Sequence, residues 1–424
     1  MTGPLRFLAC LALALPGLVH AENPRTMRVD YFHTGDVDTE IFSLDQVVLE
    51  PLPFPGNLRQ PIDTTLRGKY AFEIIDADSG ATAWSRSFSS IYGEWETTGE
   101  AREMHRTFHE SVRFAAPEQP FDLVIRKRDA DNRFREVWRL RLDPNDYLVH
   151  EESDAWSDAL VAIEVNGDPA DKVDVLLLGD GYTAHETDQF IERAKALAES
   201  LFATSPFRER RNDFNIWALA PAAAESGVSR PSTGVYRDSP AGTSYDAFRS
   251  ERYVLTYANK DWRRIASSAP YDFVEILTNT DTYGGGGIYG LFSTAAANNA
   301  YADYLFIHEF AHHFAGLADE YYTSSVAYEA PETITEPYEP NVTALLDPEN
   351  VKWKHLVAEN TPLPTPWPKD EYEEHSLAYQ EKRANMRTEN VPESAMTALF
   401  DDNQRIVEGM FSAAPYRDRI GAFE

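Results

Sequence analysis

The sequence contains almost no cysteine. Among its 424 residues there is one, Cys10, and it lies inside an N-terminal apolar stretch. A chain that loses this stretch can form no disulfide, so its stability comes from side-chain packing, with bound metal ions as a further source. Such a chain also has no thiolate that could block a metal centre in a latent state.

Basic residues are also scarce. The sequence has 39 lysines and arginines against 69 aspartates and glutamates, which gives a formal net charge of −30. Such a chain repels the phosphates of DNA and RNA, so nucleic acid is excluded as a partner. Solubility explains most of this acidity. The alternative, calcium ions (Ca2+) bound in acidic loops such as residues 319–339, stays open.

Long apolar segments are missing after the N-terminus, so no stable insertion into a membrane is expected. Residues 1–21 combine a basic start, an apolar run over 7–19 and small residues near Ala21. This pattern predicts a cleaved signal peptide over 1–21 and a secreted or periplasmic protein. A lipoprotein signal around Cys10 is disfavoured, because most of the apolar run follows that residue.

The rest of the chain begins with a β-rich part. Residues 22–150 hold short segments in which apolar and polar residues alternate, separated by turn-rich pieces, and this pattern predicts an N-terminal β-sandwich. The strands are expected over 70–75, 82–88, 121–126 and 135–142. His105 and His109 have the spacing of metal ligands, but their charged surroundings predict ordinary surface histidines.

Residues 151–171 are acidic and show no sustained period, which favours a linker. After them, alternating strands and helices predict an α/β domain over 172–424, so the whole chain is expected to be an α+β protein with more than one domain. Strands are expected over 173–178, 214–219 and 273–277, and helices from a capping box at 183–186 onward and over 245–258.

The most specific motif is His308-Glu309-Phe310-Ala311-His312. On a helix, residues four apart lie on one face, so His308 and His312 can bind one metal ion while Glu309 acts as a base beside it. Apolar neighbours at 304–307 and at Phe314 predict that this helix is buried. Imidazoles and a carboxylate in a buried helix need partners, which favours a zinc site over a chance match.

A catalytic zinc ion needs a third protein ligand and one open position. Gly316 can end the helix in the left-handed conformation, and Asp319, three residues later, could reach the metal. Glu320 is the first alternative and His375 the second. His313 points away from the same metal, which favours a packing or supporting role.

The glycine run over 284–287 lacks the lysine and hydroxyl residue of a phosphate-binding loop. It permits two interpretations. One is a flexible connection without further function. The other is a backbone edge that an extended peptide can approach and join as an added strand, with Gly286, Gly287, Ile288 and Tyr289 binding the substrate.

With these motifs in view, the sequence resembles the immunoglobulin-A peptidase family of secreted zinc metallopeptidases, a metzincin-like group. The resemblance centres on 308–322 and extends over nearly the whole chain after the first 21 residues. Its other motifs are Ser89-Ser90-Ile91-Tyr92-Gly93-Glu94-Trp95, Phe108-His109-Glu110-Ser111-Val112-Arg113-Phe114, Leu178-Gly179-Asp180-Gly181-Tyr182, Ser250-Glu251-Arg252-Tyr253 and the run over 283–289.

The resemblance implies a metzincin-like zinc peptidase domain with one catalytic Zn2+. It implies His308, His312 and Asp319 as the ligands, Glu309 as the base, and a methionine turn at Met386 beneath the metal. One departure from the broader metzincin pattern concerns the third ligand. Gly316 stands four residues after His312 rather than three, and an aspartate replaces a histidine, so Glu320 stays open beside Asp319.

Together these features predict a secreted zinc-dependent endopeptidase that hydrolyses peptide bonds of proteins, with a zinc-activated water and Glu309 as general base. Tyr321, Tyr322 or an arginine could stabilise the oxyanion. The alternative is a surface-binding or adhesive protein with a catalytically silent metallopeptidase-like domain, although an intact Glu309 argues against it. A protein or peptide substrate is expected, but its identity, including immunoglobulin A, and the oligomeric state are not predicted.

Overall fold

The structure is a computed structural model that describes residues 24–320 and 334–423. The expected signal peptide and the two tyrosines Tyr321 and Tyr322 therefore lie outside the described residues, as does most of the acidic loop over 319–339. Among the helices of the described part, none has both the length and the apolar character needed to cross a bilayer.

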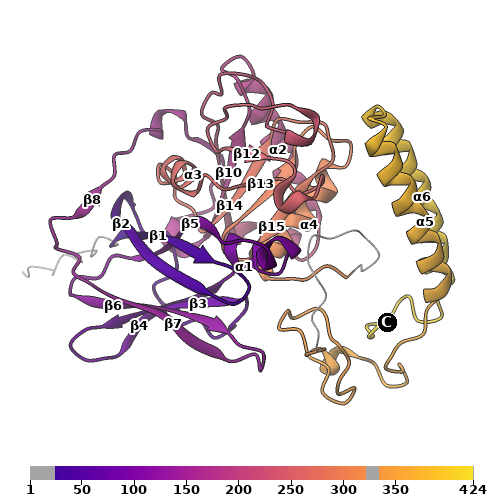
Figure 1. The fold of residues 1–424 in the computed structure, drawn as a ribbon, viewed down its shortest axis with the longest axis horizontal. Helices are drawn as coiled ribbons and strands as arrows, with labels where there is room; N and C mark the ends of the chain where they lie inside the picture. Colours follow the sequence, from indigo (N-terminus) through magenta and orange to yellow (C-terminus); the bar gives the residue numbers. More distant parts are fainter. Residues whose placement is uncertain (1–23, 321–333, 424) are drawn as a thin grey trace, which may run out of the picture.

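The N-terminal part consists of two sheets packed face to face (Figure 1). One sheet has the strand order β5-β1-β2-β8 and the other the order β4-β3-β6-β7. Alternate residues such as Phe72 and Ile74 of one sheet and Val29 and Tyr31 of the other are buried in one shared apolar core, as in a β-sandwich. The strands are β1 (Arg25–Gly35), β2 (Glu40–Pro53), β3 (Tyr70–Asp76), β4 (Thr82–Phe88), β5 (Arg106–Ala115), β6 (Phe121–Arg128), β7 (Phe134–Leu142) and β8 (Val149–Glu151).

The second part is built on a six-stranded sheet with the order β15-β16-β14-β10-β11-β9. The four central strands are parallel, and the two edge strands β15 and β9 run antiparallel to their neighbours. The strands are β9 (Val161–Glu164), β10 (Val173–Asp180), β11 (Phe214–Leu219), β14 (Phe273–Thr278), β15 (Gly285–Ile288) and β16 (Phe292–Ala296). Two short strands, β12 (Thr243–Ser244) and β13 (Leu255–Thr256), pair with each other as a separate small sheet.

Both faces of this sheet are covered, which explains why β10 is apolar without interruption. Val175 and Leu177 pack against helices α2 (Thr187–Ala203) and α4 (Ala302–Ala315). Leu176 and Leu178 face the other way, towards α3 (Asn259–Ala266) and the short helix α1 (Ile91–Trp95) of the N-terminal part. The two parts of the chain therefore share this apolar cluster, in addition to the core that each has of its own.

Two predicted segments differ from the structure. The linker expected over 151–171 contains β9, which pairs with β11, so the second part begins earlier than expected. The helix expected over 245–258 is absent. Instead, Leu255 and Thr256 pair with Ser244 and Thr243 as short strands, and the N–H of Val254 donates to the carbonyl of Gly285. Left-handed backbone at Asp246, Phe248 and Arg249 is incompatible with a regular α-helix.

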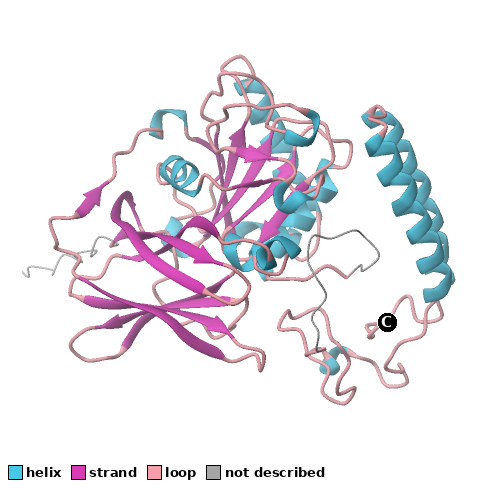
Figure 2. Cartoon of the chain, in the orientation of Figure 1, coloured by secondary structure: helices cyan, strands magenta, loops and turns pink. Residues whose placement is uncertain are grey.

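Near the C-terminus, α5 (Lys369–Thr388) and α6 (Glu393–Ala413) form a hairpin that stands beside the rest of the molecule (Figure 2). It is joined to the second part by an ion pair of 2.6 Å between Arg383 and Glu251 and by a hydrogen bond from Tyr301 to Asp401. The sequence did not predict these two helices individually.

Candidate metal centre

Helix α4 places the motif residues at the edge of the sheet. Its apolar residues Leu305, Phe306 and Phe310 are buried, and it packs against β15 and β16. The helix ends at Gly316, whose φ of 62° lies in the left-handed region and whose N–H donates to the carbonyl of His312 over 3.0 Å. The chain then turns back across the end of the helix.

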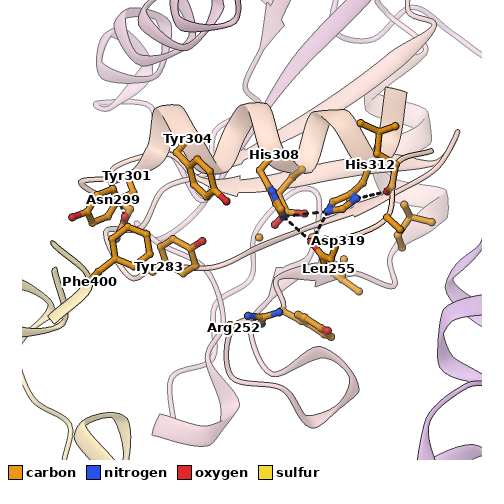
Figure 3. Close-up of a pocket in the computed structure, with 18 of the residues that line it drawn as sticks. Arg252, Leu255, Tyr283, Asn299, Tyr301, Tyr304, His308, His312, Asp319 and Phe400 are labelled. Carbon is orange, nitrogen blue, oxygen red and sulfur yellow. Dashed lines mark hydrogen bonds and ion pairs between the residues drawn. The ribbon is translucent and has the colours of Figure 1, made fainter. Parts of the chain in front are cut away.

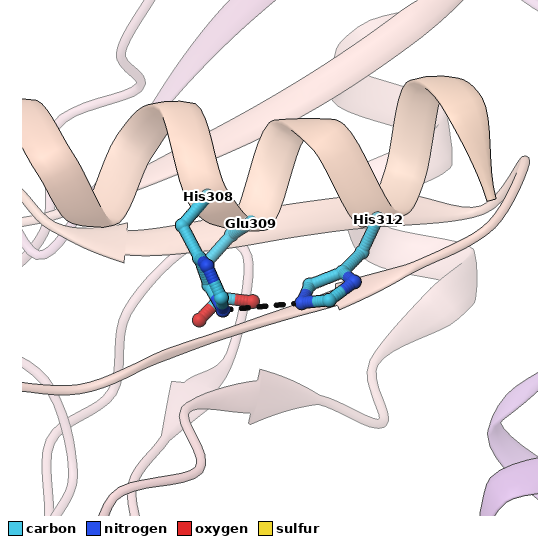
Figure 4. A group of neighbouring side chains, drawn as sticks. All are labelled: His308, Glu309 and His312. Atoms are coloured by element: carbon cyan, nitrogen blue, oxygen red, sulfur yellow. Dashed lines mark hydrogen bonds between the residues drawn. The ribbon is translucent and has the colours of Figure 1, made fainter. Parts of the chain in front are cut away.

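Three ligand atoms converge below this turn (Figure 3), and Figure 4 shows the two histidines together with Glu309. The Nε2 atoms of His308 and His312 lie 3.2 Å apart, and Oδ1 of Asp319 lies 3.1 Å from the first and 3.2 Å from the second. Ligand atoms held 2.0–2.1 Å from a tetrahedral zinc ion lie about 3.3–3.4 Å apart. These three atoms could therefore hold one zinc ion and leave its fourth position open.

The surroundings prepare two of these groups to bind a cation. Burial opposes ionisation of Asp319, but the neighbouring imidazoles hold the pKa of its carboxyl well below the ordinary value. His312 Nδ1 lies 2.5 Å from the carbonyl oxygen of Leu317 and donates its proton there. This bond leaves the lone pair of Nε2 free to face a metal.

The two alternative third ligands lie elsewhere. The carboxylate of Glu320 accepts a hydrogen bond of 3.0 Å from Asn341. His375, on α5, has its Nε2 3.0 Å from Oδ1 of Asn403. Among the described residues, Asp319 is thus the carboxylate that meets both histidines.

Glu309 lies on the same side of α4 as the two histidines, and one carboxylate oxygen is within 4.8 Å of a ligand atom of each. Burial raises the pKa of this carboxyl above its ordinary value. A carboxylate in this position can exchange a proton with a reacting group near the metal position without being one of the three converging ligands.

The glycine run forms the ordered edge strand β15 and is not a flexible connection. A Cβ on Gly287 would overlap the carbonyl oxygen of Glu309 and lie 2.8 Å from Cβ of His312. Glycine therefore lets the strand approach the backbone of α4 closely.

On the outer edge of β15, Gly287 has a backbone N–H and C=O that no other described residue pairs with. Gly285 donates to the carbonyl of Arg252 over 3.1 Å and accepts from Val254 over 3.2 Å, and the carbonyl of Tyr289 accepts from Ser89 over 2.8 Å. By the two-residue period of a strand, the N–H and C=O of Gly287 point to the same side. Within 24–320 and 334–423, no hydrogen bond on this side occupies them.

A cleft of about 730 Å³ surrounds these groups. One wall comes from the α5–α6 hairpin and another from residues of the N-terminal part, including Gly68 and Ser89. Tyr283 and Tyr304 also line it, and the ring of Tyr304 stacks on His308 at 5.5 Å (Figure 3). Burial raises the pKa of both phenols, so each stays a neutral donor. No motif in the sequence marks Tyr304, although it lies one helical turn before His308.

The prediction of a methionine turn at Met386 is wrong in this structure. Residues 385–387 form part of the last turn of α5, because the segment 369–388 contains neither glycine nor proline to interrupt the helix. Met386 is not among the residues that line the cleft, whereas Arg383 and Arg387 on the same helix are.

His313 has the packing role that its position predicted. Its Nδ1 donates to the carbonyl of Ile288 over 3.1 Å, and its Nε2 accepts from the N–H of Val274 over 3.2 Å. Burial lowers the pKa of His313 to about 3, so the ring is neutral. It ties α4 to the edge strand and to the middle of the sheet.

His105 and His109 lie far from this centre in the N-terminal part. His105 is exposed and lies 3.1 Å from Asp36. His109 is largely buried, contrary to the prediction of a surface histidine, with its Nε2 3.1 Å from Asp45 and its Nδ1 3.1 Å from the side chain of Asn259. Its neighbours come from β2 and α3, which the sequence spacing did not reveal.

Comparison with known proteins gives two matches to protein families. The family described as IgA Peptidase M64 matches residues 161–424, and the family described as Peptidase M64 N-terminus matches residues 20–139. No curated protein matches the chain. The match to IgA Peptidase M64 begins at the first residue of β9, where the second part of the structure also begins, and residues 140–160 belong to neither match.

Proposed function

The chain belongs to the IgA peptidase M64 family, and from this premise we propose that it is a zinc-dependent endopeptidase that cleaves internal peptide bonds of proteins. Membership of the family already implies a metallopeptidase with a protein or peptide substrate. The finer proposal is supported by one observation. The ligand atoms of His308, His312 and Asp319 converge at the separations of a tetrahedral zinc site, beside the buried Glu309.

When bound, a zinc ion at this position would polarise the scissile carbonyl and lower the pKa of a water molecule towards ~7. Glu309 would accept the proton of the attacking water and pass it to the leaving amine. Its raised pKa makes the carboxylate a stronger base in the first half of this transfer. In the second half the proton still moves on, because the leaving amine is far more basic than a carboxylate. During this transfer, Nδ1 of His312 keeps its proton, which stays hydrogen-bonded to the carbonyl oxygen of Leu317.

An extended substrate would pair with the free N–H and C=O of Gly287. Because Gly287 packs against the backbone of Glu309, this pairing would bring the scissile bond next to the base. The neutral hydroxyls of Tyr283 and Tyr304 line the same cleft and could donate to the oxyanion. They are our candidates among the described residues, in addition to Tyr321 and Tyr322.

We also propose export. The basic start and apolar run of residues 1–21 support a cleaved signal peptide and a site of action in the periplasm or outside the cell. N-terminal sequencing of the protein recovered from its native host should begin at Glu22, and an uncleaved Met1 would reject this part of the proposal.

The catalytic proposal is tested with Glu309→Ala, beside the exposed control variant Glu192→Ala. The Glu309 variant should keep one zinc ion per chain by elemental analysis but lose at least ~1,000-fold in hydrolysis of a peptide blocked at both ends, because the proton acceptor is gone. The control should match the wild type in both measurements. Undiminished hydrolysis by the Glu309 variant would reject the mechanism, and wild-type protein without stoichiometric metal would favour the adhesive alternative.

A further inference from the structure

The third candidate ligand is held differently from the other two. His308 and His312 are fixed by the hydrogen bonds of α4, whereas Asp319 lies beyond the end of that helix. Its position depends on the backbone of residues 316–318, which we call the ligand turn. A turn of this kind has no ladder of its own hydrogen bonds, so other groups must fix it if the carboxylate is to meet the histidines.

The first such group comes from the N-terminal part. Arg67 extends across the domain boundary, and its Nη1 donates to the carbonyl oxygen of Ala315, the last residue of α4, over 2.6 Å. The last carbonyls of a helix have no partner within it and carry partial negative charge, so a guanidinium group is well suited to bind one. This bond holds the start of the ligand turn.

Packing around Tyr289 reinforces the same contact. A Cβ on Gly68 would lie 2.8 Å from the ring of Tyr289, and a Cβ on Gly316 would lie 3.1 Å from it. The ring is therefore held between the glycine that follows Arg67 and the glycine that ends α4. Tyr289 was expected to bind substrate, but these contacts make it part of the domain boundary, although it also lines the cleft.

The second group is Asn341, which lies 22 residues after Asp319 in the sequence. Its Oδ1 accepts from the N–H of Ala318 over 2.9 Å, and its Nδ2 donates to the carbonyl of the same residue over 2.8 Å. Nδ2 also donates to Glu320 over 3.0 Å. An amide side chain can donate and accept at once, so Asn341 fixes both polar groups of the residue directly before Asp319.

We propose that Arg67 and Asn341 are positioning residues for Asp319, and that the N-terminal domain is thereby a working part of the metal centre. The inference rests on the proposed zinc peptidase function. Arg67 fixes the start of the ligand turn and Asn341 fixes its end, so the carboxylate is held in place before the metal arrives. Loss of an outer group that orients a metal ligand weakens metal binding by about 10- to 100-fold.

The test measures the zinc dissociation constant by competition with a chromophoric chelator, which does not depend on catalysis. Arg67→Ala and Asn341→Ala should each bind zinc about 10- to 100-fold more weakly than the wild type. Arg67→Lys should recover part of the loss, because it keeps a cationic donor. The exposed controls Arg135→Ala and Asn145→Ala, both in the N-terminal domain, should bind zinc like the wild type.

A double-mutant cycle separates positioning from general structural damage. In an Asp319→Ala background, Asn341→Ala should cause no further loss of zinc affinity, because the ligand through which it acts is gone. The positioning inference would be overturned by an equal loss of zinc affinity in both backgrounds, or by wild-type zinc affinity in Arg67→Ala and Asn341→Ala. Either result would leave the proposed function intact. If the wild-type protein itself bound no zinc, the proposed function would fall instead. Should an alanine variant fail to fold, Arg67→Lys and Asn341→Asp carry the same comparison.

Discussion

Replacing Gly287 by alanine tests the close approach of β15 to α4. The added methyl group would overlap the carbonyl oxygen of Glu309 and lie 2.8 Å from Cβ of His312. Carbon atoms in contact lie about 3.5–4.0 Å apart, so strand and helix would have to separate by about 1 Å. Both partners are part of a rigid sheet and helix, and neither contact is the end of a flexible side chain.

The expected loss follows from this displacement. Moving the substrate-binding strand by about 1 Å relative to Glu309 should lower kcat/KM by about 100-fold, equivalent to ~2.7 kcal/mol of transition-state stabilisation. Overpacking should also lower the free energy of unfolding by about 1–3 kcal/mol, which leaves most of the protein folded.

Gly286→Ala provides a control on the same strand. Its added methyl group points to the other side, where the nearest atom, at 2.8 Å, is the terminal Cδ2 of Leu255, and that side chain can move aside. We expect a loss in kcat/KM of no more than about threefold. The measurement is kcat/KM for hydrolysis of one peptide by Gly287→Ala and by Gly286→Ala, with circular dichroism to confirm that both variants are folded. Equal activities of the two variants would refute the reasoning.

Two further predictions concern stability. His33 is buried with its ring nitrogens 2.8 Å from Glu110 and 2.7 Å from Glu40, and although burial opposes its charge, these carboxylates raise its pKa above the ordinary value. A raised folded-state pKa stabilises the protein below about pH 6.5 and loses that effect as the pH rises through the folded-state value, with a slope of up to ~1.4 kcal/mol per pH unit. Urea unfolding of the wild type and His33→Gln between pH 5 and pH 9 should show this slope only in the wild type, and identical profiles would contradict the assignment. Separately, His313→Leu should lower the free energy of unfolding by at least ~2 kcal/mol, because the carbonyl of Ile288 and the N–H of Val274 lose their partner inside the protein. The exposed His105→Leu should change it by less than ~0.5 kcal/mol, and an equal effect of the two substitutions would disprove the tether.

Local sequence patterns predicted those elements whose burial is periodic or continuous. The strand expected over 173–178 matches β10 because a strand covered on both faces is apolar at every position. Helix α4 and its end at Gly316 follow from an apolar helix and a glycine that can adopt positive φ. No helix forms over 245–258, because the backbone of residues 254–256 pairs with Thr243, Ser244 and the distant Gly285.

The same distinction applies within the site. The spacing of the two histidines is local to one helix, so the sequence was sufficient to pair them. Arg67 meets Ala315 across 248 positions, and Asn341 meets Ala318 across 23, and neither contact leaves a periodic signal in the sequence. The prediction of a methionine turn at Met386 failed for a related reason. Whether a methionine lies beneath the metal depends on where α5 packs, and the residues next to the methionine in the sequence do not determine that packing.

The position of the N-terminal domain also bears on how the catalytic sheet is stabilised. A parallel sheet with one uncovered face would expose apolar residues such as Leu176 and Leu178 to water. Here that face is covered by α3 together with Tyr92 and Trp95 of α1, both of which are fully buried. The chain matches two separate families, yet one of its apolar clusters is built from both parts, and the same boundary carries Arg67 to the end of α4. Because Tyr92, Trp95 and Arg67 all belong to the N-terminal domain, the cover of the sheet and the metal centre depend on the same interface.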